Sequence, residues 1–322
     1  MTVNPSENEG GATRLVVEAT EAGVRLDGLL AQRQVFASTS AARRALAAGI
    51  VRVNGQAAKK GAHLQAGDIV ELSEGSSQGV VLAPAPDQEL TVLYQDDDLV
   101  AVDKPAGIAS HPLHPGGGPT VASALVARFP ECAAASPDAR EGGLGHRLDV
   151  GTSGVLLAAR SREVWYRLRE SLATAACEKI YLAEVLGEFP SADMREFVLP
   201  GPRPSSLVVT APIGRQGRRG SKVKLAAGRQ PLPARTEVTL LESRSGTALV
   251  EARLARGRAH QVRAHLGFLG IPVVGDATYG QVDSPTTSGL HLHAWAVSLV
   301  HPITAKPLHI EAPLPVWARR QI

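Results

Sequence analysis

The segment GLGHRLDVGTSGVLLAAR, residues 143–160, carries the clearest structural signal in the sequence. Its second half, from Ser153 to Arg160, is an apolar run with the length of a buried strand, and the glycines and polar residues before it predict a turn. Asp149 lies in that turn. A carboxylate at the end of a buried strand is held rigidly and faces a cleft more readily than the core. The same side chain could instead brace the turn, as aspartates near glycines commonly do.

The segments around this strand predict an α+β fold. Ser161 is placed to cap a helix in which Val164, Trp165 and Leu168 fall on one face. Most of the remaining strand-like segments are adjacent or hairpin-like neighbours, which favours a mixed, largely antiparallel sheet with flanking helices. These segments are residues 90–95, 97–104, 178–187, 236–242, 247–254 and 290–300.

A second informative segment is ARGRAHQVRAHLGFLGIPVVGDATYG, residues 255–280. Its middle, from His260 to Leu269, predicts a helix that Gly270 closes. Arg263 lies one turn from the start of that helix. The planar guanidinium fork suits bidentate recognition of a carboxylate or a phosphate. A solvated basic helix is the alternative interpretation.

Residues 14–73 have the pattern of a small separate domain. Two short helices precede a hairpin that the pair Asn54-Gly55 marks. The range contains eight basic and five acidic side chains, which is a balance of +3. We expect a disordered leader at residues 1–13, a linker rich in Gly, Ser and Pro at 74–88 and a larger second domain at 89–322.

Length and composition restrict the classes of protein to which the chain can belong. A chain of 322 residues suggests two domains, and 44% hydrophobic with 20% charged residues excludes a disordered, collagenous or coiled-coil chain. Its two cysteines, Cys132 and Cys177, cannot form a disulfide framework or a four-cysteine zinc site. No apolar run approaches the roughly 20 residues that span a bilayer, and the polar N-terminus lacks the features of a signal peptide. We therefore expect a cytoplasmic protein.

Five segments of the second domain resemble the RluA-type RNA pseudouridine synthases, and they occur in the order of that family. They are VLYQDDDLVAVDKPAGIASHP, GHRLDVGTSGVLLAAR, EKIYLAEV, GRAHQVRAHLGFLGIPVVGDATYG and LHLHAWAVSLVHP. The resemblance implies an isomerase that converts uridine to pseudouridine, with large-subunit ribosomal RNA as the expected substrate and transfer RNA as the alternative. In the first domain, RLDGLL, GIVRVNG and AGDIVEL resemble the S-four-like (αL) RNA-binding domain, which is commonly appended to such enzymes.

This resemblance assigns roles to individual residues. Asp149 matches the essential catalytic aspartate, and Arg263 matches the arginine that pairs with it. Tyr181 matches the aromatic residue that packs on the flipped uracil, which makes these three the expected catalytic set. Arg147 matches an arginine that helps to displace the target base. Val262 occupies an apolar wall where the family usually has Ile or Leu.

Further residues are expected to bind the RNA. Arg258 and His260 belong to the substrate-binding segment beside Arg263. In the αL domain, the second helix and the following turn lie on RNA phosphates, which gives this role to Arg43, Arg44, Arg52, Lys59 and Lys60. Residues 215–229 carry six positive charges and no acidic residue, so we expect an arm that contacts phosphates, with Arg218 and Arg219 among its contacts.

The isomerisation that the resemblance implies involves no redox change and transfers no group from outside, so we expect neither a cofactor nor a metal. The histidine pair His260 and His265 is spaced unfavourably for a shared ion on a helix, and His291 and His293 lack a motif-linked third ligand. We expect these histidines to form hydrogen bonds. RNA is the expected partner, without a membrane or an evident obligate protein partner. A non-catalytic RNA-binding or ribosome-assembly protein with the same fold is an alternative to the enzyme. The chemical route also stays open: Asp149 attacks the sugar carbon, or acts through the base or a ribose proton.

Overall fold

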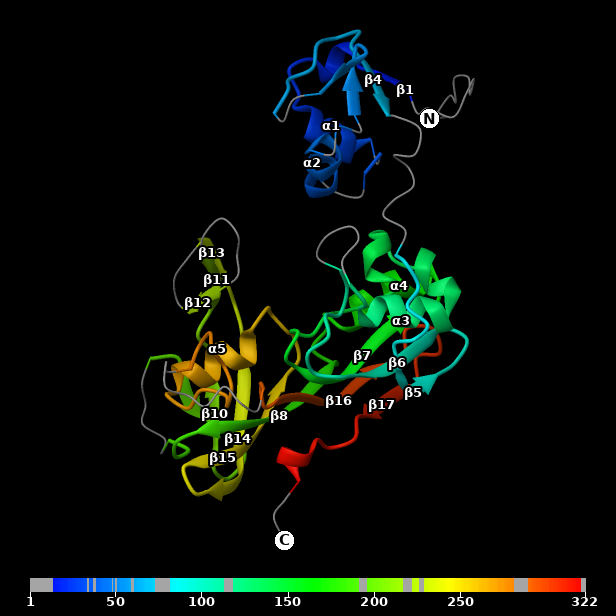
Figure 1. The fold of residues 1–322 in the computed structure, drawn as a ribbon. Helices are drawn as coiled ribbons and strands as arrows, with labels where there is room; N and C mark the ends of the chain where they lie inside the picture. Colours follow the sequence, from blue (N-terminus) through cyan, green and yellow to red (C-terminus); the bar gives the residue numbers. More distant parts are fainter. Residues whose placement is uncertain are drawn as a thin grey trace. The chain divides into compact units, whose positions relative to one another are not determined.

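The computed structural model divides the chain into two compact units, residues 1–81 and 82–322 (Figure 1). Each unit has its own hydrophobic core, and the two are described separately below. The structure describes residues 14–33, 35–36, 39–47, 49, 51–58, 61–72, 82–112, 118–190, 196–216, 222–225, 229–280 and 289–319.

The first unit packs two helices on a small antiparallel sheet. The sheet order is β1-β4-β2-β3, and the core centres on the fully buried Leu26 and Leu30 of α1. The predicted hairpin is confirmed, because Asn54 and Gly55 both have positive φ angles, 51° and 77°, as a two-residue turn of this kind requires. The elements are β1 (Arg14–Val16), α1 (Leu26–Gln32), α2 (Thr39–Ala47), β2 (Val51–Val53), β3 (Gln56–Ala57) and β4 (Ile69–Leu72).

The second unit is built on one large sheet, which confirms the predicted α+β fold. The sheet order is β5-β6-β7-β16-β8-β15-β14-β10-β9, with β17 paired to β16. Its described strand pairs are antiparallel except β7 with β16. The strands are β5 (Thr91–Gln95), β6 (Leu99–Lys104), β7 (Ser153–Ala159), β8 (Glu178–Leu186), β9 (Val198–Pro200), β10 (Ser206–Val209), β14 (Thr236–Arg244), β15 (Thr247–Leu254), β16 (Leu292–Val300) and β17 (Pro307–Glu311).

Three helices cover this sheet: α3 (Val121–Arg128), α4 (Arg162–Ser171) and α5 (Gln261–Phe268). The predicted cap of α4 is confirmed, because the Ser161 hydroxyl accepts a hydrogen bond from the Val164 amide at 3.3 Å. Alternating side chains of β6 and β7 pack on α3 from one face and on α4 from the other. Helix α5 packs on β8, β14 and β15.

Tyr181 marks the place where the cores under α3 and α5 meet. It packs against both hydrophobic clusters, so the two helices cover the same face of the sheet on either side of this residue. The cross-strand partners of Tyr181 are Ala252 on β15 and Ala294 on β16. Small neighbours on both sides leave the tyrosine ring as the largest side chain in this part of the sheet face.

The basic segment after β10 differs from its expected form. The sequence indicated no strands here, whereas the structure forms a three-stranded antiparallel sheet of β11 (Ile213–Gln216), β12 (Lys222–Leu225) and β13 (Arg229–Leu232). Ile213 is buried with Ala234 and Ala264, and Leu225 packs against them. This small apolar contact anchors the strands to α5, and it links residues too far apart in sequence for a local pattern to predict.

None of the helices that the structure describes has both the length and the apolar character needed to cross a membrane.

The parallel contact between β7 and β16 generates a stability prediction. Gly154 has a φ of 109°, and a Cβ atom there would collide with the backbone of Ala294. We expect Gly154→Ala to lower the free energy of unfolding by more than about 2 kcal/mol, from backbone strain and this collision together. Gly187→Ala is the matched control: its φ is 88° but nothing lies within 4 Å, so only the strain of about 1 kcal/mol remains. Urea denaturation of both variants measures the difference, and equal losses would contradict the role of the close contact.

Candidate active site

The backbone on both sides of Asp149 is held by the segment that follows β6. The Ser110 hydroxyl donates to the Leu148 carbonyl at 2.9 Å and accepts from the Leu148 amide at 3.0 Å. On the other side, the Val150 carbonyl accepts from the Gly107 amide at 2.8 Å and from Lys104 Nζ at 3.1 Å. Asp149 is therefore positioned by neighbours whose own hydrogen bonds fix the turn.

Lys104 is a fully buried lysine beneath this turn. Its Nζ also donates to the Pro105 carbonyl at 2.8 Å. Burial lowers the pKa of Lys104 from 10.5 to about 8, although the charges of Asp149 and Asp103 oppose that shift. Near neutral pH the lysine is thus a buried cation close to the Asp149 carboxylate.

Arg263 connects two carboxylates from different segments. Its Nη1 donates to Asp149 Oδ2 at 2.8 Å, while its Nε and Nη2 donate to the two oxygens of Asp276, both at 2.7 Å. The Asp276 side chain is fully buried, and those of Arg263 and Asp149 are 10% and 23% exposed. The predicted pairing of Arg263 with Asp149 is thus present in the geometry, and Asp276 is an additional partner.

Arg263 and the two carboxylates of Asp149 and Asp276 stabilise one another's charged forms. Burial opposes the ionisation of Arg263, yet its bonds to Asp276 and Asp149 raise its pKa above the ordinary value. Burial also opposes the ionisation of Asp276, but the bonds from Arg263 and the backbone amides of Thr278 and Tyr279 lower its pKa. Asp276 therefore fixes the orientation of the guanidinium, which leaves Nη1 directed at Asp149.

His260 lies at the edge of the site, where it precedes α5. It adopts a left-handed backbone conformation, with a φ of 55°, and its Nε2 is 3.7 Å from Asp149 Oδ1. Its Nδ1 is 3.2 Å from the Tyr279 hydroxyl. Burial lowers the pKa of His260, an effect that the charge of Asp149 partly offsets. The imidazole is consequently uncharged at neutral pH.

Tyr181 contributes a neutral phenol to the same site. Burial, and then the nearby charge of Asp149, raise its pKa above the ordinary value. The phenol therefore keeps its proton at neutral pH. Tyr181 lies where the two hydrophobic cores meet and is only partly buried, so part of its ring remains accessible on this face of the sheet.

The other predicted substrate-binding residues of this unit lie at different depths. Arg147 is exposed and lines a small hollow with His111 and Val150, in the same turn as Asp149. The Arg258 amide donates to Gln261 Oε1, and its guanidinium Nε is buried without a partner among the described residues. Val262 is buried in the hydrophobic core under α5. His260 lies between α5 and the Asp149 turn.

Two family models match the sequence of this chain. Residues 98–267 match the model of the RNA pseudouridylate synthase family, and residues 24–70 match the model of the S4 domain. The chain belongs to the RNA pseudouridylate synthase family. The enzyme is accordingly an isomerase that acts on RNA, and this outcome counts against the non-catalytic alternative.

Similar proteins cover almost the whole enzyme. An uncharacterized RNA pseudouridine synthase of Mycobacterium bovis is 34% identical, over 91% of this chain and 92% of the relative. The ribosomal large subunit pseudouridine synthase D of Nitrosomonas europaea is 31% identical, over 96% of this chain and 86% of the relative. Among solved structures, human RNA pseudouridylate synthase domain containing 4 aligns with a TM-score of 0.52 and 26% identity, covering 75% of this chain and 94% of that chain.

The predicted RNA contacts of the first unit are only partly within the described residues. Arg43 forms an ion pair with Asp27, and Arg52 donates to the Gly55 carbonyl at 3.3 Å within its own hairpin. The side chain of Arg44 and the residues Lys59 and Lys60 lie outside the part of the chain that the structure describes. The same holds for Arg218 and Arg219, the predicted RNA contacts on the basic arm of the second unit.

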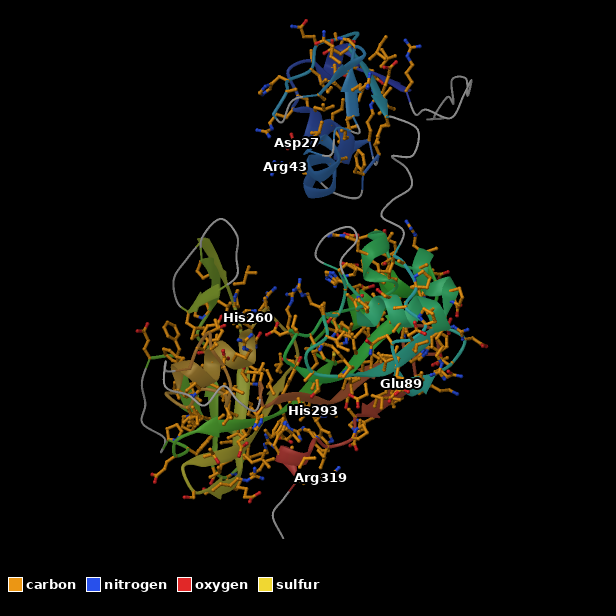
Figure 2. All side chains as sticks on the ribbon, viewed as in Figure 1. Asp27, Arg43, Glu89, His260, His293 and Arg319 are labelled. Atoms are coloured by element: carbon orange, nitrogen blue, oxygen red, sulfur yellow. The ribbon has the colours of Figure 1, made fainter. Side chains whose placement is uncertain are left out.

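The three other histidines that the sequence raised as possible metal ligands have hydrogen-bond partners, as expected. His265 is bonded to the Thr236 hydroxyl at 2.8 Å and to the Ala211 carbonyl at 2.9 Å. His291 is 2.7 Å from a Glu184 oxygen, and His293 is 2.8 Å from the Ser153 hydroxyl. These contacts assign the three histidines to the framework of the second unit; His293 is labelled in Figure 2.

One group among the described residues has the spacing of a metal site, namely Asp96, Asp98 and His301. Asp96 already accepts hydrogen bonds from the Asp98 and Leu99 amides and from the Tyr94 hydroxyl, and it is 3.0 Å from His301 Nε2. His301 Nδ1 accepts from two backbone amides. With these atoms occupied, the group braces the turn between β5 and β6.

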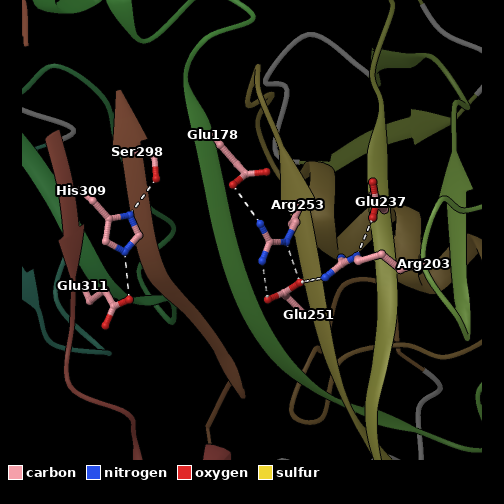
Figure 3. Close-up of polar contacts among 8 residues, drawn as sticks. All are labelled: Glu178, Arg203, Glu237, Glu251, Arg253, Ser298, His309 and Glu311. Atoms are coloured by element: carbon pink, nitrogen blue, oxygen red, sulfur yellow. Dashed lines mark hydrogen bonds and ion pairs between the residues drawn. The ribbon is translucent and has the colours of Figure 1, made fainter. Parts of the chain in front are cut away.

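A second polar cluster joins neighbouring strands of the large sheet (Figure 3). Arg253 donates to Glu178 and Glu251, and Arg203 donates to Glu251 and Glu237. The cross-strand partner of Glu251 on β8 is Leu182, the neighbour of Tyr181. Because successive side chains of a strand point to opposite faces of the sheet, this network lies on the face opposite to Tyr181 and away from Asp149. It links neighbouring strands and does not contribute to the site.

Three positioning residues escaped sequence reasoning: Lys104, Ser110 and Asp276. The available signals were weak. Asp276 lies between glycines in the GDATYG segment, and Lys104 precedes a Pro-Ala-Gly break. Neither pattern indicates which distant segment the side chain will contact.

The buried lysine generates a prediction for the pH dependence of stability. Between pH 8 and 10.5 the unfolded chain holds a proton on Lys104 that the folded chain has released, so stability rises with pH in this window. From pH 7.5 to pH 10, we expect the unfolding free energy of the wild type to rise relative to that of Lys104→Met by on the order of 2 kcal/mol. Urea denaturation of both proteins at both pH values measures this shift. A pH-independent difference would contradict the lowered pKa.

Proposed function

We propose that the enzyme converts a uridine of large-subunit ribosomal RNA to pseudouridine, with Asp149 as the catalytic carboxylate. The observation that carries this proposal is the geometry of Asp149: a partly exposed carboxylate with a buried cationic partner and a backbone held on both sides. Preorganised charge of this kind is what a reaction with a charged transition state requires.

The two oxygens of Asp149 are not equivalent. Oδ2 accepts the bond from Arg263, whereas Oδ1 has no hydrogen-bond partner among the described residues, the nearest polar contact being His260 Nε2 at 3.7 Å. Oδ1 is thus the oxygen that can meet the substrate. Isomerisation breaks the bond between N1 and the ribose carbon C1′, turns the uracil within the site and joins C5 to C1′. C5 then loses its proton and N1 gains one, so the atoms of the nucleoside are conserved. Arg263 offsets the cost of holding an ionised carboxylate there while the solvent is displaced.

The target base must leave its stack to reach Asp149. Extrusion of a base costs a few kcal/mol, which stacking and hydrogen bonds in the pocket repay. We expect the uracil to stack on the ring of Tyr181, which lies where the two hydrophobic cores meet. We expect Arg147, which is exposed and lies two residues before Asp149 in the chain, to fill the position that the base vacates.

Relatives support ribosomal RNA as the substrate. Those of Nitrosomonas europaea and Xanthomonas campestris are named ribosomal large subunit pseudouridine synthase D, and that of Pasteurella multocida is named ribosomal large subunit pseudouridine synthase C. Each covers at least 93% of this chain. Transfer RNA is the competing substrate.

The role of Asp149 is tested by Asp149→Asn. Because the substitution is isosteric and removes only the charge, we expect product formation to fall by more than about a thousandfold, with folding and RNA affinity nearly unchanged. The matched control is Asp87→Asn, which makes the same change at an exposed position and should retain full activity. Single-turnover assays on unmodified ribosomal RNA measure both. Substantial activity in Asp149→Asn would refute the assignment.

The substrate is tested by mapping pseudouridines in cells that lack the gene. We expect a large-subunit ribosomal RNA site to lose its modification, to regain it with the wild-type gene and to stay unmodified with the Asp149→Asn gene. Loss confined to transfer RNA would contradict the ribosomal target and leave the role of Asp149 intact.

A further inference from the structure

The first unit contains a buried carboxylate that two half-exposed arginines share. The Asp27 side chain is 1% exposed, while those of Arg25 and Arg43 are 48% and 50% exposed. Arg25 donates to Asp27 through Nε at 3.0 Å and Nη2 at 3.2 Å, and Arg43 donates through Nε at 2.5 Å. Asp27 and Arg43 are labelled in Figure 2.

These three residues come from two helices. Arg25 directly precedes α1, Asp27 lies in its first turn, and Arg43 lies in the middle of α2. The hydrogen bonds from Arg25, and then those from Arg43, outweigh the effect of burial and lower the pKa of Asp27 to about 2. Asp27 therefore remains ionised, and holds both guanidinium groups, throughout the physiological pH range.

Stability alone is a weak explanation for this arrangement. Apolar residues of similar volume commonly replace buried ion pairs without loss of stability. The distinctive consequence is orientation. Since Arg43 uses only Nε on Asp27, both of its terminal nitrogens have no partner among the described residues, and Arg25 likewise retains Nη1. Terminal guanidinium nitrogens form the fork that binds phosphate through two parallel hydrogen bonds.

Arg33 provides a contrast within the same unit. Its Nε and Nη2 donate to Glu21, and Nη2 also donates to Glu18, so one guanidinium faces two carboxylates. That group has a net charge of −1. Arg25 and Arg43 share one carboxylate, which leaves +1, and they are also more exposed than Arg33. The uncompensated positive charge therefore lies on the arginine pair that Asp27 orients.

We propose that Arg25 and Arg43 form a phosphate-binding fork for the RNA backbone and that Asp27 is its positioning residue. This inference rests on the proposed function, because it specifies how the first unit holds the RNA substrate. It adds Arg25 to the predicted contacts, and it assigns an acidic residue a favourable role in binding a polyanion.

That favourable role permits a sharp test with Asp27→Asn in the full-length enzyme. Removal of a negative charge should by itself strengthen RNA binding, whereas loss of the oriented fork should weaken it. We expect the KM for large-subunit ribosomal RNA from cells lacking the gene to rise by about tenfold, with kcat unchanged, as for the loss of a charge-assisted contact. Tighter or unchanged binding would overturn the proposal.

The matched control is Glu71→Gln, which removes the same charge from the same unit. Glu71 lies on β4, and its nearest cation is Arg14 at 3.9 Å. We expect this variant to bind the RNA as tightly as the wild type or more tightly. A weakening equal to that of Asp27→Asn would show that no specific orientation is involved.

A double-mutant comparison separates orientation from a general loss of structure. We expect Arg25→Ala with Arg43→Ala to weaken binding and to flatten the slope of log K against log salt by about one to two. Adding Asp27→Asn to that background should then weaken binding no further, and should leave the affinity unchanged or raise it slightly, because only the loss of a negative charge remains. A further loss of similar size would mean that Asp27 acts by stabilising the unit, and would overturn its positioning role.

Lysine variants decide the question even where Asp27→Asn does not fold. Arg25→Lys with Arg43→Lys keeps both charges but removes the planar fork, so we expect weaker RNA binding at unchanged net charge. Wild-type affinity in this variant would overturn the proposal. Failure of the fork is distinguishable from failure of the proposed function, because these variants alter KM for RNA whereas Asp149→Asn alters the chemical step.

Discussion

The candidate active site depends on one guanidinium that satisfies two carboxylates from separate parts of the chain. Asp276 occupies Nε and Nη2 of Arg263, and only Nη1 remains for Asp149. Loss of either carboxylate leaves charge without full compensation in a largely buried setting, where an unpaired ion costs several kcal/mol. The position of α5 is thereby coupled to the turn before β7, although the residues in contact are 114 apart in sequence.

The sheet brings these two parts together at its one described parallel contact. β7 carries the Asp149 turn and packs on α3 and α4, whereas β8 and β15 support α5. β16 pairs with β7 on one side and β8 on the other. The close approach of Gly154 to Ala294 therefore sets the distance between the two cores, and Tyr181 lies where they meet.

Local patterns in the sequence were sufficient for the fold class and for the elements that carry Asp149 and Arg263. Apolar periodicity, the Ser161 cap and the Asn54-Gly55 turn each depend on residues close together in the chain. The roles of Asp276 and Lys104 depend instead on which distant segment a side chain meets, and a single sequence does not contain that information. The strands β11 to β13 were missed for the same reason, since Ile213 is buried against Ala264 of α5.

Both units use a buried carboxylate to orient arginine, but the consequence differs with exposure. In the second unit, Asp276 fixes Arg263, which is 10% exposed, and its remaining nitrogen meets a carboxylate of the same chain. In the first unit, Asp27 fixes Arg25 and Arg43, which are about half exposed, and their remaining nitrogens face no internal acid among the described residues. An oriented guanidinium paired internally stabilises a charged site, whereas one left open to solvent is ready for an external anion. Burial around the same kind of ion pair thus separates the group that we propose to support the chemistry from the pair that we propose to hold the substrate.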